Sequence, residues 1–563
     1  MTDRHLLRRV LARNSTLDWL VMALLAAGLA ALYGPHLGAP RVFDDVDYFG
    51  SNYAAVVGGH FSPLALRYWS SWTFAFQRVV FGDDPAQFRL VNVALHLMVG
   101  VALFVFIRTL HALALSGVRQ DQAENDRQRT RQLAIWLVVA LFLFHPLAVY
   151  SVAYLVERST LMATLFCLLM WWAHMRGLVS GKPGWFALAG LFCYFALYSK
   201  EHSVMAPAVA VLLTLLVPHA ATGRRLLMLG FMAYFALALS VVLTQKNLIA
   251  SAYEPWLLRG AKIDHAYLSS VLTQAALFFK YLWLWWVPMA SWMAIDIREP
   301  LRDIASLWSW LGLCGFVGYC ALAFALLLRR GRLGLLGFSM LAPALLFMTE
   351  LATVRIQESF VLYRSYLWLP TMLTGLPLVF EGIRVPRRKW ALVLGLVAVG
   401  ILFALAAERL DSFSSGLRLW DDAIRLADRR GDTGFRERQY VNRGGAYFAA
   451  GKYAQALRDY DSALAWNPAY YLAHLGRARS LFQLGRKEEA IASVNRALAL
   501  KADWIEAYLA RAEFFFQMGN RDGAGADFQT ACALGSSIAC YAQEKMRTGG
   551  VGRTITVPVS QPR

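Results

Sequence analysis

Charged residues are scarce in this sequence, and acidic ones are the scarcer kind. Charged side chains make up 17% of the 563 residues, with 37 acidic against 56 basic ones, while 58% of the residues are hydrophobic. The mean hydropathy is +0.43. A water-soluble chain of this composition would aggregate, so the composition argues against a soluble globular enzyme. It predicts a multi-pass membrane protein whose first partner is the lipid bilayer.

Sequence signatures of several common protein classes are also missing. The chain has no phosphate-binding P-loop, no Rossmann glycine fingerprint and no HExxH motif, which argues against an ATP-driven transporter and a zinc protease. No compact set of metal ligands is present, so no cofactor is predicted; a divalent metal is compatible with the chemistry below but has no support. The N-terminal apolar stretch lacks a small-residue cleavage site and is predicted to remain as a membrane helix.

The net charge of +19 is distributed in a way that fits a membrane protein and not a nucleic-acid-binding one. Arginines cluster in short loops between apolar runs, where the positive-inside rule places them in the cytoplasm. These loops fall at alternate gaps, which predicts about eleven crossings, a cytoplasmic N-terminus and an exported C-terminal part. The predicted spans are 17–34, 88–109, 134–152, 158–175, 184–199, 203–218, 225–245, 306–329, 334–352, 362–381 and 388–407.

One further apolar segment, 267–289, complicates this count. It is long enough to cross, yet a crossing there would invert every later basic loop. Its Lys280 and its aromatic-rich end favour a helix that lies in the exported interface or dips into it. The number of helices around 246–305 therefore stays open at this point.

Beyond residue 437 the sequence becomes repetitive. Three sets of positions recur with a spacing of 34: Gly451, Gly485 and Gly519; Ala456, Ala490 and Ala524; and Ala463, Ala497 and Ala531. This period is the length of a tetratricopeptide repeat, in which alanines let two helices approach closely. Such arrays hold peptides or partner proteins in a concave groove, and a rigid spacer or an oligomerisation module is the alternative.

The predicted fold class is therefore all-α, in four parts. A polytopic helical membrane domain occupies 1–410, and a linker with a partial repeat follows over 411–436. A tetratricopeptide α-solenoid is predicted over 437–547, and a disordered tail over 548–563.

Polar residues gather at the exported ends of the predicted spans. A lone ionisable residue there is well explained as an anchor or a structural ion pair, but five clusters at one face favour a functional site. Carboxylates together with Arg, Lys and His donors suggest proton removal from an acceptor and cationic binding of phosphate. The clusters are Asp44, Asp45 and Asp47; His145, Glu157 and Arg158; Lys200, Glu201 and His202; Asp296 and Arg298; and Glu358, Tyr363 and Arg364.

Residues 1–410 resemble the GT-C glycosyltransferases, membrane enzymes whose first exported loop carries an acidic catalytic motif. The resemblance is strongest to their tetratricopeptide-bearing, O-mannosyltransferase-like branch. It rests on FDDVDYF, LRYWSSWTFAFQRVVFGDDPAQFRLVNVALHLMVG, HPLAVYSVAYLVERSTLMATLFCLL, LYSKEHSVMAPAVAVLL and LYRSYLWLP, followed by terminal repeats. One departure is RYW at 67–69, where such sequences often have RPL.

The resemblance implies that a sugar moves from a polyprenyl-phosphate carrier to an exported acceptor, with inversion. An alcohol is a poor nucleophile at neutral pH, so a carboxylate must take its proton. Asp44 is predicted to be that base, and Asp45 to orient the acceptor or substitute for Asp44; Asp47 fits a helix cap or a solvated loop residue better. The leaving phosphate needs fixed positive charge. Candidates for binding donor phosphate or acceptor are Arg158, Lys200, Arg364 and His202, with Tyr363 and the neighbouring Glu157 and Glu201.

Two cysteines are set apart from the four that lie in apolar runs. Cys532 and Cys540 are eight residues apart at the end of the last repeat, in ACALGSSIACYAQ. This resembles the Sel1-like cysteine-rich repeats, where that spacing staples two helices together. An exported compartment would permit a disulfide, and buried free thiols are the alternative.

Rival functions remain open on the sequence alone. A lipid-linked glycan ligase or polymerase, or a transferase acting on an envelope glycolipid, also uses lipid-linked sugars, but a ligase would place Arg and His in a large late exported loop. A transporter or flippase would spread polar residues through the spans. A membrane scaffold leaves the matching stretches unexplained. The repeats favour a protein or peptide acceptor, and the compact loops favour a bacterial inner membrane with the repeats in the periplasm.

Overall fold

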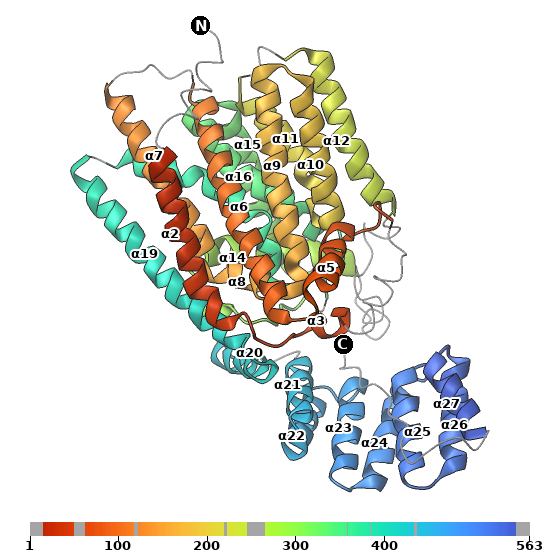
Figure 1. Ribbon diagram of the computed structural model, residues 1–563. Coiled ribbons are helices and arrows are strands. Elements are labelled where there is room, and N and C mark those ends of the chain that lie inside the picture. Colours follow the sequence, from red (N-terminus) through yellow and green to blue (C-terminus); the bar gives the residue numbers. More distant parts are fainter. Residues whose placement is uncertain are drawn as a thin grey trace. The chain divides into compact units, whose positions relative to one another are not determined.

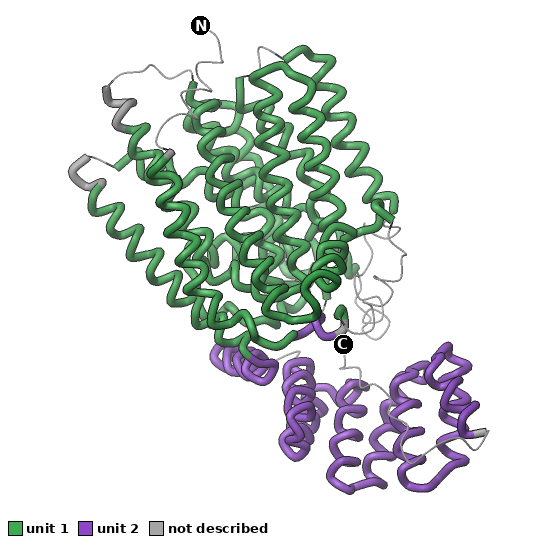
Figure 2. The backbone as a smooth tube through the Cα atoms, in the orientation of Figure 1, with its two compact units in different colours: residues 1–41, 48–414 green, residues 42–47, 415–563 purple. Residues whose placement is uncertain are grey.

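The computed structural model describes residues 15–49, 62–116, 122–218, 222–244, 265–356, 358–383, 385–432 and 436–547. Within these residues the regular structure is helical, apart from one isolated antiparallel bridge between Ile297 and Phe360. The predicted all-α class is therefore confirmed. The chain divides into two compact units (Figure 2): unit 1 comprises residues 1–41 and 48–414, and unit 2 comprises residues 42–47 and 415–563.

Unit 1 is built mainly from long apolar helices. They are α2 (Ser15–Tyr33), α6 (Pro85–Ala114), α7 (Gln122–Leu143), α8 (Pro146–Val152), α9 (Arg158–Ser180), α10 (Pro183–Ser199), α11 (Ala206–Leu216), α12 (Arg224–Thr244), α14 (Ala266–Trp286), α15 (Leu307–Leu328), α16 (Gly331–Leu351) and α19 (Val385–Ser412). Shorter helices connect them: η1 (Gly34–His36), α5 (Tyr68–Phe81), η2 (Leu155–Glu157), η3 (Glu201–Met205) and η4 (Ala290–Trp292). The short helix α3 (Asp44–Phe49) begins in unit 2.

Seven helices of the described part are long and apolar enough to cross a membrane, and α7 with α8 makes an eighth if their 59° bend lies within one span. This is fewer than the eleven crossings expected from the sequence. The difference arises because the expectation also counted the shorter α10 and α11 and the run 362–381. That run is broken into η5 (Leu362–Tyr366), α17 (Leu369–Met372), η6 (Leu373–Gly375) and α18 (Leu376–Gly382).

Proline explains the break in the run 362–381. Pro370 and Pro377 each stand in the first turn of a short helix, α17 and α18. A proline lacks the N–H that a continuing helix needs, so it starts a helix more readily than it extends one. The apolar helix α14 is not among the candidate spans.

The long helices of unit 1 divide into inner and outer ones (Figure 1). In its most apolar window α9 is 78% buried, and α6, α10 and α11 pack against it. By contrast, only 17% of the corresponding windows of α15 and α19 is buried. Large apolar side chains such as Trp308 and Leu394 are exposed on these outer helices, as expected for a face that contacts lipid.

Unit 2 consists of helices that pair in succession. After α20 (Gly416–Arg430) the order is α21 (Glu437–Ala449), α22 (Tyr453–Trp466), α23 (Tyr471–Gln483), α24 (Lys487–Leu500), α25 (Ile505–Gln517), α26 (Arg521–Ala533) and α27 (Ser537–Arg547). The recurring glycines lie in the turns inside each pair with φ of +71°, +82° and +82°, a left-handed conformation that favours glycine. The recurring alanines are fully buried between the helices. A disulfide between Cys532 and Cys540 joins α26 to α27.

Candidate active site

The acidic stretch begins the short helix α3. Asp44 is exposed at its first turn and Asp45 is fully buried. The amide of Asp45 donates to the carbonyl of Val42 at 3.2 Å, and the amide of Val46 donates to that of Phe43 at 3.1 Å. The side chain of Asp47 lies outside the described residues, so its expected role as a cap or loop residue is not addressed. Residues 42–47 belong to unit 2.

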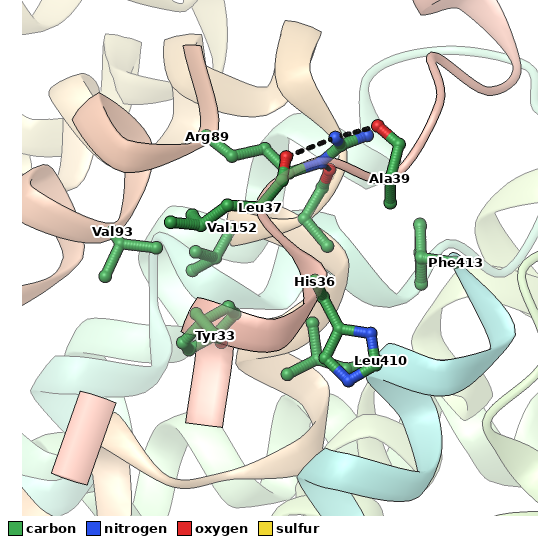
Figure 3. Close-up of a pocket in the computed structure, with 10 residues that line it drawn as sticks. Tyr33, His36, Leu37, Ala39, Arg89, Val93, Val152, Leu410 and Phe413 are labelled. Atoms are coloured by element: carbon green, nitrogen blue, oxygen red, sulfur yellow. Dashed lines mark hydrogen bonds between the residues drawn. The ribbon is translucent and has the colours of Figure 1, made fainter. Parts of the chain in front are cut away.

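Arg89 on α6 holds the segment that leads from α2 towards this stretch. Its buried guanidinium donates to the carbonyls of Leu37 at 2.9 Å and Pro40 at 2.6 Å, and also to that of Ala39. Figure 3 shows the hydrogen bonds from Arg89 to Leu37 and Ala39, beside a small pocket lined mostly by apolar side chains. A guanidinium carries five donors in a rigid fork, and here it binds three carbonyls within the four residues 37–40. The residues just before the acidic stretch are thereby anchored to α6.

Lys200 and Glu157 form a buried ion pair between two loops of unit 1. The Lys200 Nζ lies 2.8 and 3.1 Å from the two carboxylate oxygens of Glu157. The hydroxyl of Thr160 donates to the same carboxylate, and the Lys200 Nζ is 5.4 Å from the centre of the Tyr363 ring. Burial lowers the pKa of Lys200, and the charge of Glu157 opposes that shift. The pair is thus a tightly held cation and anion, with an aromatic face on one side.

A second cluster centres on Glu350, at the end of α16. Its carboxylate lies 3.2 Å from the His202 Nε2, 3.2 Å from an Arg364 nitrogen and 3.4 Å from the Arg355 Nε. Arg364 also binds the carboxylate of Glu358 at 2.8 Å. Arg364 also donates to the backbone carbonyl of Glu358 at 3.0 Å. Arg364 is therefore held by two carboxylates, those of Glu350 and Glu358.

Glu201 stands between Lys200 and His202 in the sequence and has two charged or ionisable partners. It pairs with Arg67 at 2.6 Å and approaches the His202 Nδ1 to 3.6 Å. Burial alone would raise the pKa of Glu201, but the charge of Arg67 and its hydrogen bond hold that pKa well below its usual range. Burial lowers the pKa of His202, against the pull of Glu350. His202 is therefore mainly neutral near pH 7, and Glu201 is charged.

The structure thus brings together most of the predicted binding residues. Glu157, Lys200, Glu201, His202, Tyr363 and Arg364 join one network in unit 1, although Tyr363 and Arg364 lie more than 150 residues beyond the other four in the sequence. Asp44 and Asp45 belong to unit 2. Such a network supplies fixed donors and charges whose side chains are already ordered.

Arg158 is placed differently from the other predicted cations. It is fully buried, with its guanidinium 3.9 Å from the centre of the Phe74 ring. Its N–H groups donate to the side chain of Asn92 at 2.8 Å and to the carbonyl of Phe88 at 2.9 Å. Arg158 thus ties the start of α9 to α6 and α5.

Sequence reasoning missed three members of the network: Arg67, Glu350 and Arg355. Glu350 lies inside the apolar run 334–352, and an ionisable residue within a span is a functional candidate by default. That signal was present in the sequence. Nothing comparable marked Arg67, which stands at the departure from the GT-C pattern noted above. Among the described residues, no group of three or more His, Cys, Asp or Glu is placed to hold a metal ion.

Comparison with known proteins identifies the C-terminal array. Residues 447–514 match the family model of the tetratricopeptide repeat. Unit 2 carries tetratricopeptide repeats. The prediction from the period of 34 is therefore confirmed. No curated protein sequence matches the chain.

Two solved structures are similar to part of this chain. The first tetratricopeptide domain of Spaghetti (RPAP3), bound to an HSP90 peptide, is 23% identical, and the match covers 20% of this chain and 92% of that chain with a TM-score of 0.20. The MamA protein is 20% identical, and the match covers 32% of this chain and 97% of that chain with a TM-score of 0.21.

Proposed function

We propose that this protein is a membrane glycosyltransferase of GT-C type that moves a sugar from a polyprenyl-phosphate carrier to a hydroxyl of an exported protein. The observation that carries the proposal is the buried network of unit 1. The three stretches that contribute to it, VER at 156–158, SKE at 199–201 and LYR at 362–364, are among those that resemble the GT-C family. A binding site requires these three stretches to come together in space. Charged residues that each anchored a separate helix at the membrane surface would not have to meet.

The proposed reaction is a single displacement with inversion. The acceptor oxygen attacks the anomeric carbon, the bond between that carbon and the phosphate oxygen breaks, and its electron pair leaves with the polyprenyl phosphate. Asp44 takes the hydroxyl proton, because an alcohol needs a base at neutral pH. Asp45 is buried and suits the orienting role better than contact with a large acceptor.

The cations of the network stabilise the phosphate as it leaves. In the described part, four basic side chains, Arg67, Lys200, Arg355 and Arg364, are balanced by Glu157, Glu201, Glu350 and Glu358. The carboxylates keep the cations in place before the donor binds, so little reorganisation accompanies charge transfer to the phosphate. Arg67 has 49% of its side chain exposed and is the member best able to approach a bound anion. Arg158 is proposed to stabilise the site indirectly, by joining the start of α9 to α6 through its hydrogen bonds with Asn92 and Phe88.

The proposed location is a bacterial inner membrane, with the tetratricopeptide repeats in the periplasm. Tetratricopeptide arrays commonly bind extended peptides, so the array is proposed to hold the acceptor protein. The eleven-crossing topology is part of this proposal: it counts the seven or eight candidate spans, the two shorter apolar helices and the broken run 362–381.

The test is the Asp44→Asn variant, which removes the base and keeps the shape of the side chain. Exported proteins from cells with the wild-type chain are expected to carry an added sugar mass that is lost with Asp44→Asn at unchanged protein abundance. Asp303→Asn is the matched control, since Asp303 is an exposed carboxylate that accepts from the amide of Ala305 at 2.9 Å, and asparagine can do the same. An identical mass profile for wild type and Asp44→Asn would contradict the proposal.

The same experiment separates the rival functions. If the Asp44-dependent mass appears on envelope glycolipids and not on proteins, the protein is a glycolipid-modifying transferase or a lipid-linked glycan ligase. If no product depends on Asp44, a flippase or a scaffold with a peptide-docking array becomes the better account.

A further inference from the structure

Phe43, the residue directly before the acidic pair, has an unusual backbone conformation. Its φ is +60°, in the left-handed region that a bulky side chain rarely adopts. Such a conformation persists only where the surroundings hold it in place, and it often marks a functional position. The contacts of the Phe43 side chain therefore show what stabilises this backbone conformation.

Two helices of unit 2 enclose the Phe43 ring. The ring stacks on Trp420 of α20, with centroids 5.3 Å apart and planes at 20°. The guanidinium of Arg438 on α21 lies 4.8 Å from the centre of the same ring. Trp420 and Arg438 are themselves buried, at 5% and 8% exposure. A stacked aromatic pair and a cation over the ring both stabilise one orientation of the ring.

The division of the chain agrees with these contacts. Residues 42–47 group with 415–563, so this short acidic piece belongs to the same compact unit as the tetratricopeptide helices (Figure 2). It is separated in sequence from the rest of unit 2 by more than 360 residues. No sequence pattern signals this grouping, because neither Trp420 nor Arg438 lies at a recurring repeat position.

We infer that Trp420 and Arg438 are positioning residues for the carboxylates of Asp44 and Asp45. They act through Phe43, whose left-handed backbone sets the direction in which α3 starts. The tetratricopeptide unit is then more than a docking arm, because its first two helices seat the segment that carries the proposed base. This inference rests on the proposed function for its catalytic consequence, but the seating itself can be measured without any assay of sugar transfer.

The first test is hydrogen exchange in the full-length protein in detergent. Trp420→Ala should speed exchange of the Asp45 and Val46 amides by about tenfold, which corresponds to the loss of one stacked aromatic pair. Trp420→Phe keeps a ring for Phe43 to stack on and should restore most of the protection. Trp466→Ala removes a half-exposed tryptophan of α22 and should leave both amides unchanged.

Exchange in α25 and α26 shows whether the array is still folded in each variant. Protection there should be the same in wild type, Trp420→Ala and Trp466→Ala. Unchanged exchange of the Asp45 and Val46 amides in a folded Trp420→Ala protein would overturn the inference. If Trp420→Ala unfolds the array, Phe43→Ala applies the same test from the other side of the stack and should also speed exchange.

The second test is kinetic, on the sugar-transfer product. Trp420→Ala should lower kcat about tenfold with little change in the KM for the donor, and Trp420→Phe should recover most of the rate. A rise in KM with unchanged kcat would contradict a positioning role. If Trp420→Ala speeds exchange of the Asp45 and Val46 amides but no sugar transfer depends on Asp44, Trp420 still positions α3 and the proposed function is wrong. If sugar transfer depends on Asp44 but Trp420→Ala leaves exchange unchanged, only this inference is wrong.

Discussion

At the scale of single residues, Glu350 has three partners in the proposed site. One carboxylate serves His202, Arg355 and Arg364, and its side chain is only 3% exposed. A buried ion pair is weak evidence for stability in itself, but removing one partner leaves an uncompensated buried charge. Here the loss would remove the carboxylate that lies 3.2 Å from Arg364 and 3.4 Å from Arg355.

Glu350→Gln is therefore expected to destabilise the full-length protein by about 3 kcal/mol. The measurement is the thermal unfolding midpoint in detergent, with the yield of folded protein as a second readout. Glu489→Gln is the matched control: Glu489 pairs with Arg486 one helical turn away on the surface, with both side chains about half exposed, and such pairs contribute little. Equal midpoints for Glu350→Gln and wild type would show that the cluster is not an ordered ion-pair network.

The residues of the candidate site were predicted from the sequence only in part. Lys200, Glu201, His202 and Arg364 stand out because a charged residue beside an apolar run is conspicuous and calls for an explanation. Their partners in space were not predictable, since pairings such as His202 with Glu350 join stretches with no shared pattern. Arg158 is equally conspicuous in the sequence and was predicted to bind phosphate with the other cations. In the structure its guanidinium instead contacts Asn92 and Phe88 on α6.

At the scale of elements, periodicity decided what could be predicted. The repeat period of 34 identifies the tetratricopeptide helices because glycine is needed at each left-handed turn and alanine at each close approach. The apolar runs identify the long helices of unit 1 in the same way. The break in the run 362–381 was not predicted, because mean hydropathy does not show where Pro370 and Pro377 interrupt a helix.

A second repeating feature of the array became clear only in the structure. Arg443, Arg477 and Arg511 recur with the period of 34, and each pairs with an aspartate sixteen residues away on a neighbouring helix. Hydrogen bonding to Asp459 raises the pKa of Arg443, although burial opposes it. Arg511 donates twice to Asp527, at 2.8 and 2.7 Å, and also to Asn495 on α24. These arginines therefore clamp successive helices together.

Arg511→Met should consequently destabilise the array, although the arginine is partly exposed and solvent screens its pairing. A loss of about 1 kcal/mol is expected, since a paired fork with two acceptors exceeds an ordinary surface pair. Hydrogen exchange of α25 and α26 in the full-length protein measures it. Arg486→Met is the control, because its pair with Glu489 lies within one helix and is exposed; an equal loss in both variants would refute the clamp.

At the scale of the whole molecule, the proposed function requires the acidic stretch and the tetratricopeptide helices to lie on the exported side of the membrane. The acidic stretch and the tetratricopeptide helices belong to one compact unit, so a single aqueous compartment must contain both. If that compartment is the exported one, an external acceptor can reach the proposed base and the docking array together. The disulfide between Cys532 and Cys540 agrees with an oxidising compartment.

Labelling of single cysteines in intact cells with a membrane-impermeant maleimide tests this most directly. Gly38→Cys is suitable because an added side chain there meets nothing within 4 Å, and Lys487→Cys is exposed on the array. Arg329→Cys, at the exposed end of α15, is the expected cytoplasmic control. The background carries Cys314→Ala and Cys320→Ala. The account predicts that Gly38→Cys and Lys487→Cys react in intact cells while Arg329→Cys reacts only after lysis; protection of either of the first two until lysis would contradict it.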